Sequence, residues 1–314
     1  MIERIKITSR EQWLAGREKD ITASAAGALL GVHPYMTAFS LYLLKAKLIT
    51  EDPEETPPMR RGRLLESVAV QMLREDQPTW TIHDHPVGYY YRDPVARIGA
   101  TPDVLATDEH GKMGIVQIKS VEPSIFRRDW KNEDGSIEPP LWIVCQAIIE
   151  AHLTGADWAA VAPMVIGFGV ELPVIPIPIH AGILDRIKAE VATFWQRIDE
   201  GRNYEPDFGR DGSLIAKLYP QDNGVEIDLS GDNRMVELVD ALEKARKAKK
   251  LVKDDEDLAK NEIASKMGEA AIARLADGRR VTNKTQERNV GCKHMPGLFC
   301  SQSEFRVMRL VKGL

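Results

Sequence analysis

Three polar side chains near one predicted hairpin have the types and spacing needed for hydrolytic chemistry. Asp103 follows Thr-Pro, and the segment Val116-Gln117-Ile118-Lys119 lies beyond a turn at residues 108–111. Side chains alternate along a strand, so Gln117 and Lys119 should point to the same face. Fourteen residues separate Asp103 from Gln117, which suits two adjacent antiparallel strands. We therefore expect Asp103, Gln117 and Lys119 to converge on one edge of a sheet.

Phosphodiester hydrolysis would use this combination of groups. The reaction needs a hard cation held by oxygen ligands, a positioned water, and positive charge near the developing phosphorane. Asp103 would supply an anionic ligand, the Gln117 side-chain oxygen a second, and the Ile118 carbonyl a third. The Lys119 ammonium could orient the water, help to deprotonate it and stabilise the transition state. Taken alone, an Asp and a Lys on a hairpin are weak evidence.

Other polar residues strengthen the hypothesis. Glu66 lies one turn after Gly62, a residue that is unfavourable in a helix, which suggests a close approach there. Gln146 interrupts an apolar run, and a buried amide must find a partner. Arg17 and Ser24 flank a predicted helix N-terminus, where a phosphate binds readily. A bland alternative places Glu66 at the edge of its helix rather than in a metal site.

The elements that must position these residues follow from hydrophobic periodicity. We predict helices over residues 24–30, 38–48, 59–74, 141–153 and 183–198, and strands over residues 79–83, 87–91, 98–106, 113–121, 158–168 and 170–179. This order indicates an α/β fold with a mixed sheet flanked by helices. We assign residues 1–207 to this core.

Residues 208–314 have a different character and form a predicted extension. Residues 233–276 are rich in Lys, Glu, Ala and Leu, which favours long exposed helices with solvated charged faces. Strands are expected over residues 279–285 and 305–310, as a terminal pair. Cys292, His294 and Cys300 lie close together between them, but a zinc site needs a fourth ligand, so a plain loop with free thiols is favoured.

Composition limits the class of protein. Of 314 residues, 42 are basic and 47 acidic, so the net charge of −5 excludes a uniformly basic histone-like binder but not a nucleic-acid enzyme with a locally positive groove. The N-terminus lacks the apolar core of a signal peptide, and no segment is suited to crossing a membrane. Three cysteines favour a reducing compartment. We expect a cytosolic, cytoplasmic protein.

Two basic clusters are candidates for DNA contact. Arg60, Arg61 and Arg63 adjoin Glu66 and therefore the expected site. Arg127 and Arg128 follow the strand that carries Lys119, and for them contact with phosphates and a solvated loop are equally good interpretations.

Several motifs together resemble the YqaJ-like viral recombinase family, relatives of lambda exonuclease within the PD-(D/E)XK nuclease superfamily. The matching segments are ITASAAGALLGVHPYMTAFSLYLLKAKLI, MRRGRLLESVA, IGATPDVLA, VQIKS and PPLWIVCQAIIEAHLTGAD. The resemblance covers residues 10–207 closely and the remainder loosely. It implies a PD-(D/E)XK restriction-endonuclease-like core with a helical C-terminal extension and a terminal strand pair.

The resemblance also implies roles in the active site. Glu66 matches the helix carboxylate, Asp103 the metal-binding Asp, and Lys119 the catalytic Lys. Gln117 stands where the family usually has Glu, so the site has one negative charge fewer. The implied metal site comprises Glu66, Asp103, Gln117 and Ile118. Gln146 matches the family's polar residue on the helix after the catalytic strand.

The implied activity is a metal-dependent DNA exonuclease of phage or prophage recombination, using Mg²⁺, for which Mn²⁺ substitutes. By resemblance, Arg17 and Ser24 would receive the terminal phosphate of a strand digested from its 5′ end. The implied partners are duplex DNA ends, a phage single-strand annealing protein and further copies of the chain, in a trimeric or tetrameric ring.

Two alternatives remain open at this stage. The same core could act as an endonuclease or nickase, or the change from Glu to Gln could leave a catalytically weak DNA-binding or assembly protein. An exonuclease leaves closed circular DNA intact, whereas an endonuclease does not. Any metal-dependent turnover of DNA argues against the weak binder.

Overall fold

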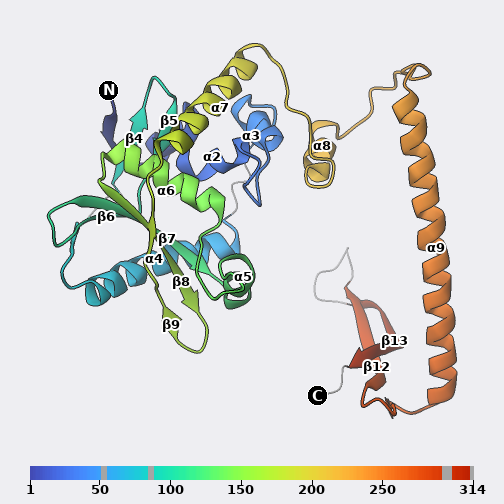
Figure 1. Ribbon diagram of the computed structural model, residues 1–314. Helices are drawn as coiled ribbons and strands as arrows, with labels where there is room; N and C mark the ends of the chain where they lie inside the picture. Colours follow the sequence, from blue (N-terminus) through green and yellow to red (C-terminus); the bar gives the residue numbers. More distant parts are fainter. Residues whose placement is uncertain (51–54, 84–87, 292–298, 312–314) are drawn as a thin grey trace. The chain divides into compact units, whose positions relative to one another are not determined.

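The chain folds into two units, each compact in itself (Figure 1). The computed structural model describes residues 1–50, 55–83, 88–291 and 299–311. Internal contacts group Met1–Asp222 into the first unit and Asn223–Leu314 into the second. The sequence predicts that the functional core ends at residue 207. The division between the two units falls later in the chain, so the boundary at 207 stays a prediction.

The first unit contains a six-stranded mixed sheet that carries the predicted hairpin. Its order is β10-β8-β7-β6-β3, with β9 paired to β8. The bounds are β3 Thr81–His83, β6 Val104–Thr107, β7 Met113–Val121, β8 Trp158–Ile166, β9 Val170–Glu171 and β10 Ile175–Ile177. β6 and β7 are antiparallel, whereas β7 and β8 are parallel. A parallel pair needs a long crossover, and α6 (Leu141–Thr154) lies within that connection.

A second, four-stranded sheet was not foreseen. Its order is β1-β4-β5-β2, with bounds β1 Glu3–Lys6, β2 Ile21–Thr22, β4 Tyr89–Asp93 and β5 Ile98–Ala100. The mixed α/β class is confirmed, but the single predicted sheet is wrong. The predicted strand 98–106 divides at Thr101-Pro102-Asp103, so that β5 and β6 join different sheets. Proline lacks the N–H that a central strand would donate.

Two helices cover the opposite faces of the six-stranded sheet (Figure 1). α4 (Pro57–Asp76) begins with a Thr56 cap and two prolines, and buries Ala69 and Leu73 with Val116 and Ile118 of β7. α6 instead packs with Ile115 and Val121. The alternation along β7 therefore turns its odd-numbered side chains, including positions 117 and 119, toward α6.

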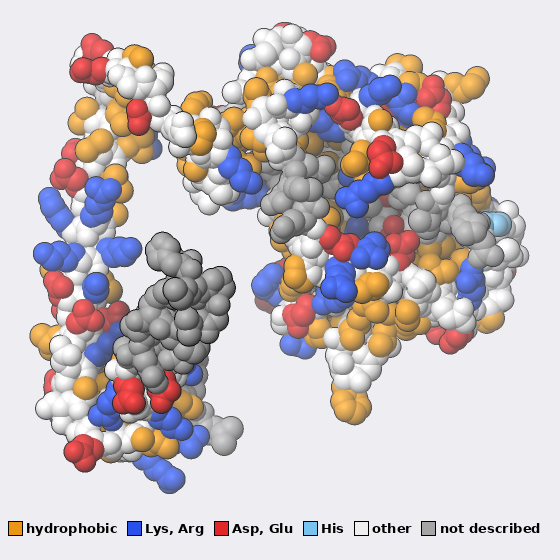
Figure 2. All heavy atoms as spheres, turned by 180° about the vertical axis from the view of Figure 1, so that it is seen from behind, with side chains coloured by type: hydrophobic (Ala, Val, Ile, Leu, Met, Phe, Trp, Pro, Cys, Tyr) orange, Lys and Arg blue, Asp and Glu red, His pale blue; other side chains and the backbone are white. Residues whose placement is uncertain are grey.

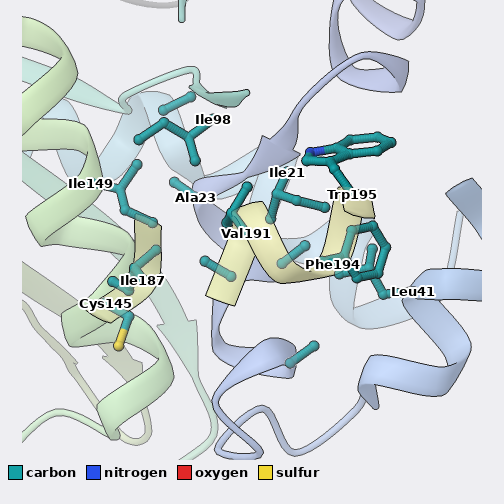
Figure 3. Packing of buried hydrophobic residues seen from close by; sticks show 14 of the residues in the cluster. Ile21, Ala23, Leu41, Ile98, Cys145, Ile149, Ile187, Val191, Phe194 and Trp195 are labelled. Carbon is teal, nitrogen blue, oxygen red and sulfur yellow. The ribbon is translucent and has the colours of Figure 1, made fainter. Parts of the chain in front are cut away.

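A layer of helices packs beyond α6. α2 (Ala23–Leu29), α3 (Ala38–Lys45) and α7 (Ala181–Asp199) bury one apolar cluster with α6, and Figure 3 shows its core around Val191 and Phe194. Gly27 permits this packing, because a Cβ there would lie 2.7 Å from Cβ of Trp142. Three short helices escaped prediction: α1 (Arg10–Glu18), α5 (Pro123–Asp129) and α8 (Gly212–Leu218).

The second unit consists of one long helix and a three-stranded sheet of order β11-β12-β13. Its elements are α9 (Asn233–Met267), β11 (Ile272–Arg274), β12 (Arg280–Gly291) and β13 (Phe299–Val311). The predicted helical extension and terminal strand pair are confirmed. The helix ends earlier than the predicted residue 276, because Gly268 has a positive φ and begins the turn into β11. Cys292, His294 and the side chain of Cys300 lie outside the described residues.

Within the described ranges, no helix is both long and apolar enough to cross a membrane.

A buried ion pair links Asp20, which precedes β2, to Arg92 of β4 in the four-stranded sheet. Asp20 is fully buried and accepts hydrogen bonds from Nε and Nη2 of Arg92, each at 2.9 Å. The Tyr90 hydroxyl donates to the same carboxylate at 3.1 Å. Arg92 also reaches Glu3, whose side chain is about half exposed. The buried carboxylate is thus satisfied entirely by its neighbours in the sheet.

We predict that Asp20→Ala destabilises the first unit by about 3–5 kcal/mol, because it leaves the partly buried Arg92 without its main partner. Urea denaturation measures the loss. Glu3→Ala removes the exposed partner of the same arginine and should cost less than about 1 kcal/mol. Equal losses in the two variants would contradict this account.

Candidate active site

The β6–β7 hairpin brings Asp103 beside Gln117, as expected. Val104 pairs with Val116, so the residues immediately outside this pair, Asp103 and Gln117, are also neighbours. Oδ2 of Asp103 accepts the backbone N–H of Ile118 at 2.9 Å and a short hydrogen bond from the Gln117 amide. The side chain just before β6 is thereby fixed against the middle of β7.

The Gln117 amide lies between two of the predicted ligand oxygens. Its Nε2 donates to the Asp103 carboxylate and, at 3.3 Å, to the Ile118 carbonyl. Gln117 is 2% exposed, and its Oε1 has no hydrogen-bond partner within the described part of the chain. Rotation of the amide about its last bond would bring Oε1 to the position that Nε2 now occupies.

Lys119 points toward α6 and is held there by polar and aromatic contacts. Its Nζ donates to Oε1 of Gln146 at 2.9 Å and lies 5.3 Å from the centre of the Trp142 ring. Gln146 in turn donates from Nε2 to Oε1 of Glu150 at 2.8 Å. The prediction that the buried Gln146 amide must find a partner is confirmed. It has two.

A cavity of about 1080 Å³ opens above these groups. The polar and charged side chains that line it include Arg17, Ser24, Arg63, Glu66, Asp103, Gln146 and Glu150. They come from α1, α2, α4, the end of β6 and α6, so residues far apart in the sequence meet here. Figure 2 shows acidic and basic side chains gathered around a hollow on one face of the first unit.

Burial dominates the electrostatics of the site. It raises the pKa of Asp103 to about 7, with the Lys119 charge opposing the shift and Glu66 adding to it. Burial also raises the pKa of Glu66, and that of Glu150 to about 8. For Lys119 burial lowers the pKa, against the attraction of Asp103 and Glu150. Perturbed carboxyl and ammonium groups around one cavity are typical of a functional site.

Arg17 and Ser24 both line the cavity, Ser24 from the start of the predicted helix and Arg17 from α1, which was not predicted. Arg17 lies in the last turn of α1 rather than at a helix N-terminus, and its guanidinium stacks on the Trp13 ring at 4.2 Å. Ser24 lies in the first turn of α2. Nearby, Glu18 pairs with Lys47, and Asp20 pairs with Arg92.

The predicted basic clusters differ in their surroundings. Arg63 lines the cavity and pairs with Glu55 at 2.7 Å, whereas Arg61 donates from Nη2 to the Ser120 carbonyl at 3.1 Å and so ties α4 to β7. Arg60 is exposed on the same helix. Arg127 and Arg128 are exposed on α5, away from the residues that line the cavity, and Arg128 pairs with Asp129.

The residues present fit a hard divalent cation. Asp103, the Ile118 carbonyl and the rotated Gln117 amide would offer three oxygens, and Glu66 lines the same cavity. Oxygen ligands are those that Mg²⁺ and Mn²⁺ prefer. Among the residues described, no group of three or more His, Cys, Asp or Glu could hold a metal ion. A site here therefore depends on the uncharged oxygens of Gln117 and Ile118.

Glu150 is the member of this arrangement that sequence reasoning missed. It follows Gln146 by four residues, and residues at i and i+4 share a helix face. The sequence did contain a signal for it: Glu150 is a second polar residue on the buried face of an apolar helix, and it needs a partner as much as Gln146 does.

Comparison with known proteins finds a family match over part of the chain. Residues 12–157 match the YqaJ-like viral recombinase domain, and they include α4, the β6–β7 hairpin and α6. The resemblance to this family seen in the motifs is confirmed over these residues. No curated protein matches the chain.

Solved structures of similar proteins include an alkaline exonuclease from Laribacter hongkongensis. It is 20% identical, with a TM-score of 0.44, over 66% of this chain and 99% of that one. Its complex with dAMP gives 19% identity and a TM-score of 0.46 over the same shares. Likeness at this level carries no functional weight.

We predict that Gln117→Glu retains activity and binds metal more tightly, because it restores an anion beside Asp103. Calorimetric titration with Mn²⁺ measures the affinity directly. Gln71→Glu, an exposed change on α4, is the matched control and should leave the affinity unchanged. An unaltered affinity in Gln117→Glu would place this side chain outside the coordination shell.

Proposed function

We propose that this protein is a metal-dependent DNA exonuclease of phage-type recombination, which resects one strand of linear duplex DNA. The observation that supports it best is that Glu66 and Asp103 line one cavity, with Lys119 bonded to Gln146 of the same cavity, within the residues that match the YqaJ-like domain. These groups come from a helix and two paired strands, in the arrangement that phosphodiester hydrolysis requires.

Each group has a distinct role in the proposed reaction. Asp103 and Glu66, with the oxygens of Gln117 and Ile118, would hold Mg²⁺, and Mn²⁺ would substitute. Once bound, the metal supplies Lewis-acid stabilisation and lowers the pKa of a bound water. The Lys119 ammonium, bonded to Gln146 at the cavity wall, would stabilise the negative charge that develops on the phosphorane. Gln146 keeps that ammonium in position through its 2.9 Å hydrogen bond.

The polarity and the partners of the enzyme belong to the same proposal. Arg17 and Ser24 line the cavity together with Asp103, which supports capture of a 5′ terminal phosphate and digestion from 5′ to 3′. Family resemblance supports a ring-shaped homo-oligomer, a trimer or tetramer, around DNA, a phage single-strand annealing protein as partner and a cytoplasmic location.

One observation favours a second candidate. Position 117 carries an amide, and the resulting loss of one negative charge would explain a weakly active DNA-binding protein. Incubating end-labelled linear duplex and closed circular duplex with Mg²⁺ or Mn²⁺ separates the possibilities. The exonuclease digests only the linear DNA, an endonuclease or nickase also opens the circle, and the weak binder retards both without hydrolysis.

We predict that Asp103→Ala and Lys119→Ala each lower the hydrolysis rate by a factor of about 10² or more, while duplex binding survives. Gel assays of hydrolysis and fluorescence anisotropy of binding measure the two effects. Lys112→Ala, an exposed residue of the same hairpin, is the control and should hydrolyse DNA at the normal rate. Near-normal rates in either folded site variant would refute the assignment.

We predict that Arg17→Ala slows digestion of 5′-phosphorylated duplex and reduces its advantage over 5′-hydroxyl duplex. A terminal phosphate carries more charge than an internal one, so a guanidinium at the cavity wall favours it. The measurement is the ratio of the two rates in wild type and variant. Arg186→Ala, which breaks an exposed pair on α7, serves as control. An unchanged ratio in Arg17→Ala would mean that this residue does not read the end.

A further inference from the structure

Glu150 is a buried carboxylate that the proposed mechanism does not yet use. Its side chain is 1% exposed, on the face of α6 that borders the cavity. Oε1 accepts the amide of Gln146 at 2.8 Å, whereas Oε2 is buried and, within the described residues, has no partner. Glutamates are almost never fully buried unless they are paired, because desolvation of the charge is costly. A structural role alone gives no reason to keep such a group.

The hydrogen bond between Glu150 and Gln146 decides how the Gln146 side chain is oriented. An ionised carboxylate only accepts, so in that state of Glu150 the Gln146 side chain turns its NH₂ group toward Glu150 and its carbonyl oxygen toward Lys119. The Lys119 ammonium can only donate, and it therefore finds the acceptor that it needs. A neutral amide at position 150 would remove this constraint, since Gln146 could then face either way.

Glu150 also bears on the charge of the site. It attracts the Lys119 ammonium and repels the Asp103 carboxylate, so it lies within electrostatic reach of both. Position 117 of β7 holds an amide, and Glu55 at the cavity wall is paired with Arg63, so Asp103 and Glu66 are the other carboxylates considered as metal ligands. Although burial raises its pKa, the nearby Lys119 ammonium favours the ionised form of Glu150, and in that form Glu150 provides the charge that the strand lacks.

We propose that Glu150 is a positioning residue of this site, which fixes Gln146 and, through it, Lys119, and provides the inward carboxylate that position 117 lacks. The inference rests on the proposed nuclease function. If the proposal holds, positions 117 and 150 are interdependent, because a carboxylate at either position can supply the negative charge.

The test is a double-mutant cycle on the full chain with Glu150→Gln, Gln117→Glu and the double variant. The measurements are the hydrolysis rate on linear duplex with Mn²⁺, the Mn²⁺ affinity by calorimetry, and the thermal midpoint. Glu150→Gln should lower the rate at least about tenfold and the affinity about tenfold. Gln117→Glu in the same chain should recover most of both losses.

The chain offers a matched control. Gln71 donates to Glu75 at 2.8 Å on α4, the same i,i+4 pair as Gln146 and Glu150 but exposed. Glu75→Gln should therefore change neither rate nor affinity. If Glu150→Gln behaves like Glu75→Gln, or if Gln117→Glu recovers nothing, the proposal is wrong and Glu150 only packs.

Two results of the experiment call for a further measurement: a Glu150→Gln variant that does not fold, and a wild type that does not hydrolyse DNA. Should Glu150→Gln not fold, Glu150→Asp keeps the carboxylate but shortens its reach, and the proposal again expects a loss that Gln117→Glu reduces. Equal losses in the two backgrounds would overturn it. Should the wild type hydrolyse no DNA, the proposed function fails, but the cycle of Mn²⁺ affinities still tests Glu150, because binding needs no turnover.

Discussion

The pairing of β6 with β7 is the constraint on which the site depends. One register places Asp103 against the backbone N–H of Ile118 and the amide of Gln117, and a shift by one residue would turn Lys119 to the opposite face. The register is secured from both sides, because even-numbered residues of β7 pack under α4 and odd-numbered ones face α6. The hydrophobic core therefore specifies the polar geometry.

Desolvation is the second determinant of this site. The same packing that fixes the hairpin removes carboxylates and an ammonium from water, and burial is the main cause of every pKa shift at Glu66, Asp103, Lys119 and Glu150. Buried charges are tolerable when they are paired, hydrogen-bonded or bound to a cation. Within the part of the chain that the structure describes, Oε1 of Gln117 and Oε2 of Glu150 are buried without a hydrogen-bond partner.

Much of the candidate site could be predicted from the sequence. Asp103, Gln117 and Lys119 lie within one hairpin, and strand alternation together with antiparallel pairing is enough to bring them together. Gln146 could be anticipated because a polar residue in an apolar helix needs a partner. The location of Arg17 was wrong in detail, since the end of α1 gives no strong local signal, yet its place at the cavity was foreseen by resemblance.

The sequence by itself therefore determined the local elements: the periodicities of α4, β7 and α6, and the residues that each presents on its buried face. Only the tertiary structure decided that β5 and β6 belong to different sheets, and that Glu150 lies behind Gln146 and within reach of Lys119. The reason is physical. Periodicity records which side of an element is buried, whereas the partner that covers that side is chosen by packing between segments distant in the chain.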